Sequence, residues 1–155
     1  AASQFIQLLI ADFALGCCIG RVLLLWCAIP LLLIGYLVLG GQVAPLRVLQ
    51  IVVSNSLQNG FFEEFLMRGA LQTRLARLLP MSWALVITAL IFGAWHLGLG
   101  FANTGGDSLP AALASTLASQ AVLGLAFGVI FARTRNLLAP SIVHVVLNTA
   151  GAFIG

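Results

Sequence analysis

Long apolar runs with almost no charge are the feature that most constrains how this chain can fold. Of its 155 residues, 61% are hydrophobic and 7% are charged, and the mean hydropathy is +1.12. A soluble domain has about 45–50% apolar and about 25% charged residues. The charged side chains here are too few to cover a surface in contact with water. This composition excludes an ordinary soluble enzyme and a disordered chain. The net charge of +3 comes from scattered Arg residues, which excludes a nucleic-acid-binding protein.

The apolar runs are too long for typical strands and are characteristic of helices that span a membrane. They comprise residues 5–20, 22–40, 46–79, 82–100, 109–132 and 138–154. Because a span needs about 20 residues, we expect an all-α, polytopic transmembrane bundle of about six spanning helices. Residues 1–155 are expected to form a single domain. The chain begins without Met and enters an apolar run almost at once. We interpret it as processed, trimmed or cut from a longer chain, and whether an upstream helix is missing stays open.

Glycine and proline mark the places where helices are expected to end or to pack closely. The third run is longer than one span and is expected to break near Asn59–Gly60, because glycine has low helix propensity. Pro80 is expected to form the turn of a helical hairpin. The chain also contains two small-xxx-small pairs, which permit close packing of helices. These pairs are Gly16 with Gly20 and Gly124 with Gly128.

The distribution of Arg predicts how the chain is oriented in the membrane. Alternating the loops places most of the Arg residues on one side, whereas Arg47 and Asp107 fall on the other. The residues on the first side are Arg21, Arg74, Arg77, Arg133 and Arg135. By the positive-inside rule, the loops at 21, 74–80 and 133–137 are predicted to be cytoplasmic.

Polar side chains inside spanning helices are costly and usually functional. Those within the predicted helices are Asp12, Glu63, Glu64, Arg68, His96, His144 and Asn148. A single one would most often form an interhelical hydrogen bond without further function. Most of these residues, however, fall into three patterns in which two side chains are four positions apart. We therefore treat the set as a candidate site.

The first pattern separates two adjacent carboxylates. Glu64 and Arg68 are four positions apart, so they share a helix face and can pair. Glu63 is rotated by about 100° from Glu64 and points elsewhere. One carboxylate is therefore expected to be held ionised by Arg68. The other is expected to be partly desolvated, which suits a general base.

The other two patterns lie on later helices. Phe92 and His96 share one face, and Gly93 and Ala94 are expected to leave space beside them. His144 and Asn148 also share a face, and two aligned hydrogen-bond donors suit a developing oxyanion.

Depth along the predicted hairpin relates the first two patterns. Glu63 lies 17 residues before Pro80 and His96 lies 16 residues after it. In an antiparallel pair both reach about 25 Å from the turn. His144 follows the loop at 133–137 closely, so it reaches the same depth only if the first hairpin extends further out.

In this order, the three patterns resemble the EExxxR, FxxxH and HxxxN motifs of the CAAX protease and bacteriocin-processing family. These are type II CAAX prenyl endopeptidases and their prokaryotic relatives, also called glutamate intramembrane proteases. The similarity covers residues 61–150 and includes Arg68–Gly69–Ala70–Leu71–Gln72, which is similar to the family's usual continuation. It implies a CAAX-type intramembrane endopeptidase in a prokaryotic plasma membrane. Its substrate would be a membrane-associated or prenylated peptide or protein.

The resemblance also implies roles for the site residues. Glu63 and His96 hold and deprotonate a water, and His144 with Asn148 stabilises the tetrahedral oxyanion. Glu64 and Arg68 support the site by organising the helix and the substrate end. No Ser or Cys has a suitable spacing from a His to act as a nucleophile. A polar stripe is interpreted as lining a water route; its members are Ser54, Ser56, Asn59 and Glu63.

No cofactor is expected, and the nearest chemical alternative is zinc. Glu63, His96 and His144 could together ligate zinc, although the chain has no HExxH motif. Two other functions stay open. One is a catalytically silent membrane scaffold or bacteriocin-immunity-type protein, which would not need to keep these three residues together. The other is a small transporter that uses Glu and His as a proton relay. The substrate and the oligomeric state also stay open.

Overall fold

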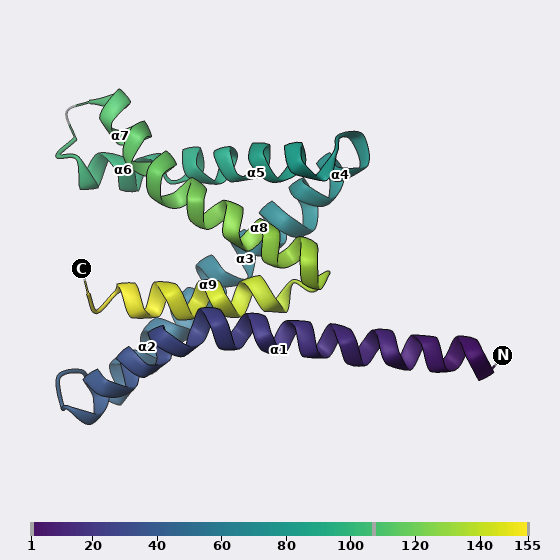
Figure 1. Cartoon of the computed structure of the whole chain (residues 1–155). Helices are drawn as coiled ribbons and strands as arrows, with labels where there is room; N and C mark the ends of the chain where they lie inside the picture. Colours follow the sequence, from purple (N-terminus) through teal and green to yellow (C-terminus); the bar gives the residue numbers. More distant parts are fainter. Residues whose placement is uncertain (1, 107, 155) are drawn as a thin grey trace. The chain divides into compact units, whose positions relative to one another are not determined.

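The chain is helical throughout the part that the structure describes. The structure is a computed structural model, which describes residues 2–106 and 108–154 and, among them, the side chains of residues 20, 21, 23–106 and 108–154. Helices, turns and loops account for all of these residues, and none of them lies in a strand (Figure 1). The predicted all-α fold class is therefore confirmed. The chain divides into two compact units, Ala1–Phe62 with Arg133–Gly155 and Glu63–Ala132.

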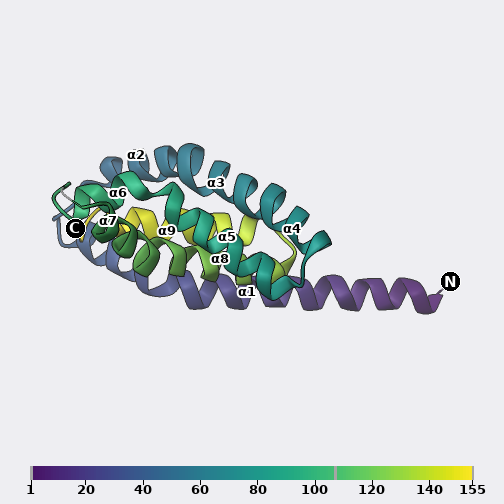
Figure 2. The same cartoon turned by 90° about the horizontal axis from the view of Figure 1, so that it is seen from above.

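The first unit combines the beginning and the end of the chain. Its elements are α1 (Ala2–Leu39), α2 (Pro45–Asn55), the π-helix η1 (Ser56–Gly60) and α9 (Leu138–Gly151). A turn at Gly40–Gly41 separates α1 from α2, and Gly41 has a φ of +69°, which glycine adopts without strain. Pro45 begins α2, where its missing N–H leaves no intrahelical bond unmade. Helix α9 lies beside α1 in both views (Figures 1 and 2).

Helix α1 contradicts the prediction of two separate apolar helices joined by a loop at Arg21. It runs without interruption over 38 residues, and Arg21 is exposed within it. The reason is that one charged residue interrupts an apolar run without interrupting a helix, since Arg is a good helix former. The side chains of Asp12 and Gly16 lie outside the described part of the chain. A Cβ added at Gly20 would meet nothing within 4 Å, so this residue makes no close helix contact.

The predicted break near Asn59–Gly60 is present. Helix η1 ends at Gly60, and Phe61 forms a turn. Gly60 is buried against α9, because a Cβ at this position would overlap the side chain of Val145. Asn55 Nδ2 also donates to Thr149 Oγ1 at 3.4 Å. The break therefore allows the end of η1 to pack directly on α9.

The second unit begins with a helical hairpin. After the single turn α3 (Phe62–Glu64), the chain forms the π-helix η2 (Phe65–Gln72) and α4 (Thr73–Leu78), and α5 (Met81–Trp95) follows. The predicted turn at Pro80 is confirmed. The predicted loop 74–80 is shorter than expected, because Arg74 and Arg77 lie exposed on α4.

The rest of the second unit packs against α5. Helix α6 (Leu97–Asn103) continues α5 after a bend of 55°. Next come α7 (Leu109–Thr116), the π-helix η3 (Leu117–Ala121) and α8 (Val122–Thr134), which together form one continuous 26-residue helix. Gly100 lets α6 approach α7 closely, since a Cβ there would overlap the carbonyl of Ala112.

The described residues contain fewer clear membrane spans than the sequence predicts. The continuous helix Leu109–Thr134 is long and apolar enough to cross a membrane. The bent pair Met81–Trp95 and Leu97–Asn103 passes the same test if it counts as one span. Leu23–Leu39 and Leu138–Gly151 are apolar but shorter. By length and composition, the described part of the chain thus has one or two such spans.

Candidate active site

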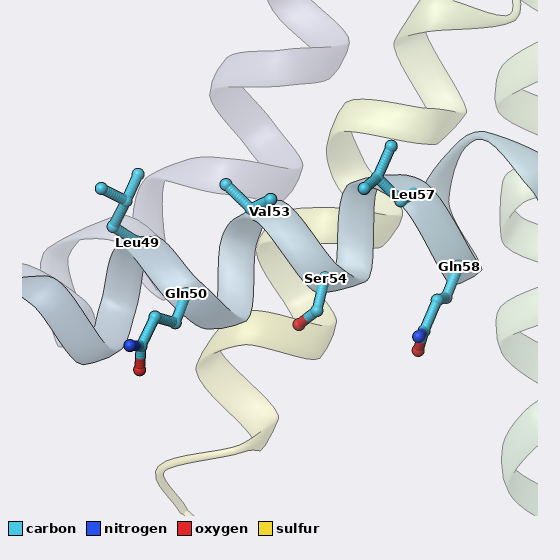
Figure 3. A pocket seen from close by; sticks show the side chains of 6 residues that line it. All are labelled: Leu49, Gln50, Val53, Ser54, Leu57 and Gln58. Atoms are coloured by element: carbon cyan, nitrogen blue, oxygen red, sulfur yellow. The ribbon is translucent and has the colours of Figure 1, made fainter.

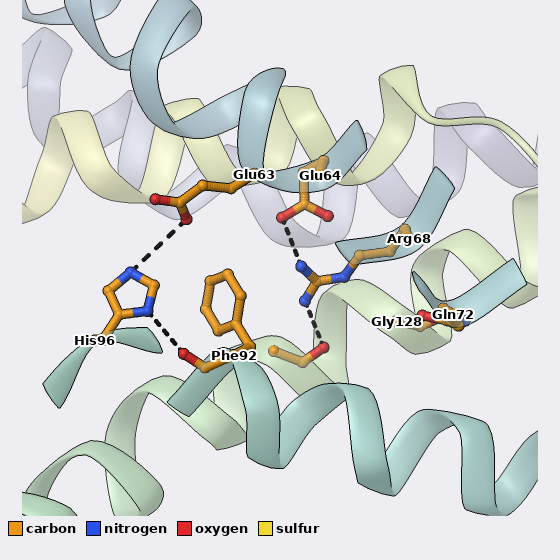
Figure 4. A network of polar contacts seen from close by, with 8 residues as sticks. Glu63, Glu64, Arg68, Gln72, Phe92, His96 and Gly128 are labelled. Atoms are coloured by element: carbon orange, nitrogen blue, oxygen red, sulfur yellow. Dashed lines mark hydrogen bonds and ion pairs between the residues drawn. The ribbon is translucent and has the colours of Figure 1, made fainter. Parts of the chain in front are cut away.

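Glu63 and His96 face each other across the hairpin. Glu63 lies at the start of the second unit, directly after the turn at Phe61, and His96 lies at the bend between α5 and α6. His96 Nε2 is 3.7 Å from Glu63 Oε2 (Figure 4). The side chains of His96 and Glu63 are 19% and 11% exposed, and Glu63 Oε2, the atom that faces His96, is itself buried. The expectation that these two residues reach the same depth is confirmed.

The bend at His96 orients the imidazole ring. In a continuous helix, Phe92 O would accept the backbone N–H of His96. Here that N–H bonds to Gly93 O at 3.1 Å instead. Phe92 O is thereby available to the ring, and Nδ1 of His96 lies 2.8 Å from it. A carbonyl oxygen can only accept, so Nδ1 carries the proton and Nε2 faces Glu63.

Glu64 points away from Glu63 and pairs with Arg68. Arg68 Nη1 lies 3.2 Å from Glu64 Oε1, and both side chains are fully buried. Arg68 Nη2 also donates to Gly124 O at 2.7 Å (Figure 4). The predicted division of the two adjacent carboxylates is therefore present. One faces a histidine near water, whereas the other is held by a buried arginine.

The ring of Phe92 lies between the two pairs. The guanidinium carbon of Arg68 is 4.7 Å from the centre of this ring, and the His96 ring is 4.6 Å from it. Phe127 also contacts Arg68, at 5.5 Å from the guanidinium carbon. Since Glu63 and Glu64 are neighbours in the chain, these contacts form a closed circuit through Arg68, Phe92 and His96.

Several contacts around this circuit are absent from the sequence-based prediction. They are the bond between His96 and the Phe92 carbonyl, the contact of the Phe127 ring with Arg68, and the bond from Gln72 to Gly128 (3.1 Å). The signals present in the sequence were the continuation of the spacing of four from Arg68 to Gln72 and the pair Gly124 and Gly128. Gly93 does not leave open space beside His96, because Ala121 fills it: an added Cβ would lie 2.9 Å from Ala121 Cβ.

His144 and Asn148 belong to the first unit, on α9. His144 is buried and Asn148 is half-buried. The four-residue spacing in a regular α-helix places them on one face, as the sequence predicts.

Three side chains of the predicted polar stripe before Glu63 lie on α2 and η1, namely Ser54, Ser56 and Asn59. Ser54 lines a hollow of about 510 Å³ on α2 and η1. In Figure 3, Gln50, Ser54 and Gln58 project from one side of this helix, and three apolar side chains project from the other. The apolar side chains are those of Leu49, Val53 and Leu57. Ser54 donates to Ile51 O at 3.1 Å and Ser56 donates to Val52 O at 2.7 Å, so both hydroxyls bond to carbonyls of their own helix.

Metal-binding side chains are few among the described residues. No group of three His, Cys, Asp or Glu side chains that could hold a metal ion is found in residues 2–106 and 108–154. Within the second unit, Glu63 and His96 face each other while Glu64 is paired with Arg68. Metal dependence is therefore a question for experiment.

Fold and site together define a class of protein: a strongly apolar helical protein that holds a Glu–His pair beside a buried Glu–Arg pair. The chain belongs to the Rce1-like family of type II CAAX prenyl endopeptidases, whose family model matches residues 45–150. The resemblance inferred from the three motifs is thereby confirmed. Proteins of this family are integral membrane proteins, and the family implies a protease that acts on prenylated substrates. Neither a curated protein nor a solved structure matches the chain significantly.

Proposed function

We propose that this protein is an intramembrane endopeptidase of the plasma membrane of a prokaryote. It hydrolyses a peptide bond near the membrane, in a membrane-associated or prenylated peptide or protein, without a metal ion. We also propose that its apolar helices form a polytopic transmembrane bundle, in which some spans are bent or short. The observation that carries the proposal is the Glu63–His96 pair.

The pair is suited to hold and activate one water molecule. The distance of 3.7 Å is too long for a direct hydrogen bond. A water can sit at about 2.8 Å from both atoms, at the apex of a triangle. Because Nδ1 of neutral His96 is protonated, its Nε2 accepts one hydrogen of this water and Glu63 accepts the other. The oxygen lone pair is then left to face a substrate carbonyl.

The reaction follows from this arrangement by general base and general acid catalysis. Glu63 takes a proton as the water oxygen bonds to the carbonyl carbon, and a tetrahedral oxyanion forms. His144 and Asn148 donate hydrogen bonds to that oxyanion. Glu63 then gives its proton to the amide nitrogen and the C–N bond breaks, which yields a carboxylic acid and an amine. The acid passes its proton to the amine, and a carboxylate and an ammonium group leave. Glu64 and Arg68 take no proton in this reaction. Their pairing keeps the Glu63 carboxylate in place.

The direct test is cleavage of a defined peptide by the purified protein. The protein in detergent micelles is incubated with a farnesylated CAAX peptide and with the same peptide lacking the farnesyl group, and products are followed by mass spectrometry. We expect cleavage at one bond and faster cleavage of the farnesylated peptide. A second comparison uses proteomics of membrane proteins in cells that carry the wild type or Glu63→Ala. If neither peptide is cleaved and the two proteomes show no difference in cleavage, a silent scaffold is favoured. Proton uptake into proteoliposomes without cleavage would favour a transporter.

The orientation is tested by accessibility of introduced cysteines. In a background without Cys17, Cys18 and Cys27, single Cys residues replace Arg77 and Asp107. A membrane-impermeant thiol reagent is applied to intact cells and to inverted vesicles. We expect Arg77→Cys to react from the cytoplasmic side and Asp107→Cys from the other. The Arg bias persists although Arg21 lies within α1, because Arg74, Arg77, Arg133 and Arg135 still fall on one side. Reaction of both from the same side would contradict the proposed topology.

A further inference from the structure

The π-helix η2 is tied to α8 by two parallel side-chain bonds. Arg68 Nη2 donates to Gly124 O at 2.7 Å, and Gln72 Nε2 donates to Gly128 O at 3.1 Å. The donors are four residues apart, and so are the acceptors. Two rungs therefore connect the same two helices, and they begin within the first turn after Glu64 (Figure 4).

The two side-chain bonds stabilise η2 more than they stabilise α8. Inside an α-helix, each backbone carbonyl already accepts the N–H of the residue four positions later, so α8 does not need the extra donors. A π-helix is rare, usually a single turn, and often found at functional sites. Helix η2 has eight residues in this form. Thr73 Oγ1 donates to Arg68 O at 2.8 Å, five residues back, which also matches a π-helical register.

Glycine at both acceptor positions makes the close approach possible. A Cβ at Gly124 would lie 2.9 Å from Cδ1 of Phe92. A Cβ at Gly128 would lie 2.9 Å from Oε1 of Gln72 and 2.9 Å from Cδ2 of Leu85. Gly124 and Gly128 of α8 therefore leave room for the side chains of Phe92 and Gln72.

Gln72 is an unfavourable residue for packing alone. It is 1% exposed, and its Oε1 is buried without a hydrogen-bond partner among the described residues. An unpaired buried oxygen destabilises the folded state relative to an apolar side chain of similar volume. Leu or Met would fill the same space without this loss. The amide is therefore explained by the bond that it donates to Gly128.

We propose that Gln72 is a positioning residue for peptide hydrolysis, which holds η2 in its π-helical register and thereby directs Glu63 toward His96. The proposal rests on the proposed function. If η2 relaxed to an α-helical register, Arg68 would rotate relative to Glu64 and to the ring of Phe92. That ring contacts His96 at 4.6 Å, so the Glu63–His96 pair would lose its alignment.

The test compares Gln72→Leu with the control Thr88→Val. Thr88 is 1% exposed and donates to Ala84 O at 2.7 Å within α5, so the control also removes one buried side-chain bond but leaves both rungs. We expect Gln72→Leu to lower kcat by about 10- to 100-fold with little change in KM, as for a misplaced catalytic group. Its unfolding temperature should be equal to or above that of the wild type. Thr88→Val should leave kcat almost unchanged.

A second variant breaks the same rung from the other helix. Gly128→Ala places a methyl group against the flexible end of Gln72 and displaces its amide, while Ala is a better helix former than Gly. We expect the same loss of kcat as for Gln72→Leu. Unchanged kcat in both variants would overturn the proposal.

A spectroscopic readout keeps this test separate from that of the proposed function. The chain contains two His residues, His96 and His144, so nitrogen NMR of labelled imidazoles gives two assignable sets of signals. We expect Gln72→Leu and Gly128→Ala to shift the Nε2 signal of His96, with Thr88→Val as the unshifted control. This result is informative even if the protein cleaves no peptide. An unmoved His96 signal would overturn the proposal, whatever happens to kcat.

Discussion

Replacement of Glu63 by Gln is expected to lower turnover by about 100- to 10,000-fold, the range for loss of a general base. Gln has nearly the same shape and still forms hydrogen bonds, but it cannot take a proton from water. Glu63 is buried but is not the carboxylate held by Arg68, so the fold should tolerate a change that keeps the shape and the hydrogen-bonding capacity of the side chain. The measurements are kcat on the farnesylated peptide and the unfolding temperature of the purified variant in detergent.

The matched control is the same substitution at the next residue. Glu64 is fully buried and pairs with Arg68 at 3.2 Å. Glu64→Gln leaves the buried guanidinium without its counter-charge, which destabilises a protein by about 3–5 kcal/mol. We therefore expect a clear fall in unfolding temperature for this variant, with activity lost largely in proportion to folded protein.

These two outcomes separate chemistry from stability at adjacent positions. Equal shifts of unfolding temperature together with equal losses of activity would contradict the division of labour between the two carboxylates. Normal turnover in Glu63→Gln would remove Glu63 from the reaction altogether.

Sequence reasoning succeeded where the geometry of a single helix or hairpin decides the outcome. The pairing of Glu64 with Arg68 follows from four-residue spacing, because neighbouring turns lie one above the other. The approach of Glu63 and His96 follows from their nearly equal sequence distances to Pro80, 17 and 16 residues. Such distances are set by helical rise, which varies little between proteins.

Prediction from the sequence is wrong or incomplete where tertiary contacts or small differences in backbone free energy determine the structure. The bend at His96 contains neither Pro nor Gly at that position, yet it releases the Phe92 carbonyl that orients the ring. The rung from Gln72 to Gly128 joins residues 56 positions apart, and its register depends on packing that no spacing encodes. Arg21 was expected in a loop, although nothing in its neighbourhood disfavours a helix strongly enough to end α1.

The proposed oxyanion donors, His144 and Asn148, both lie on α9. Asn148→Ala is expected to lower turnover by about 100- to 1,000-fold, as for removal of one oxyanion-hole donor. The matched control is Asn55→Ala in the same unit. Asn55 is half-buried as Asn148 is, and it donates to Thr149 rather than serving the proposed reaction. The control should lose stability slightly and keep its turnover.

The variant Asn148→Ala also distinguishes the metal-free mechanism from the zinc alternative, because the two mechanisms assign His144 different roles. In the metal-free mechanism His144 is a donor, chelators have little effect, and His144→Ala releases no metal. In the zinc mechanism His144 is a ligand and Asn148 lies outside the ligand shell, so its loss should lower turnover by only about 10- to 100-fold. Glu63 lies on α3, His96 at the bend between α5 and α6, and His144 on α9, and no two of them lie within one short ligand motif that would begin a zinc site. We therefore expect Asn148→Ala to show the larger loss and EDTA-treated protein to keep its activity. One equivalent of zinc per chain, together with cleavage that chelators abolish and zinc restores, would replace this mechanism and leave the endopeptidase proposal in place.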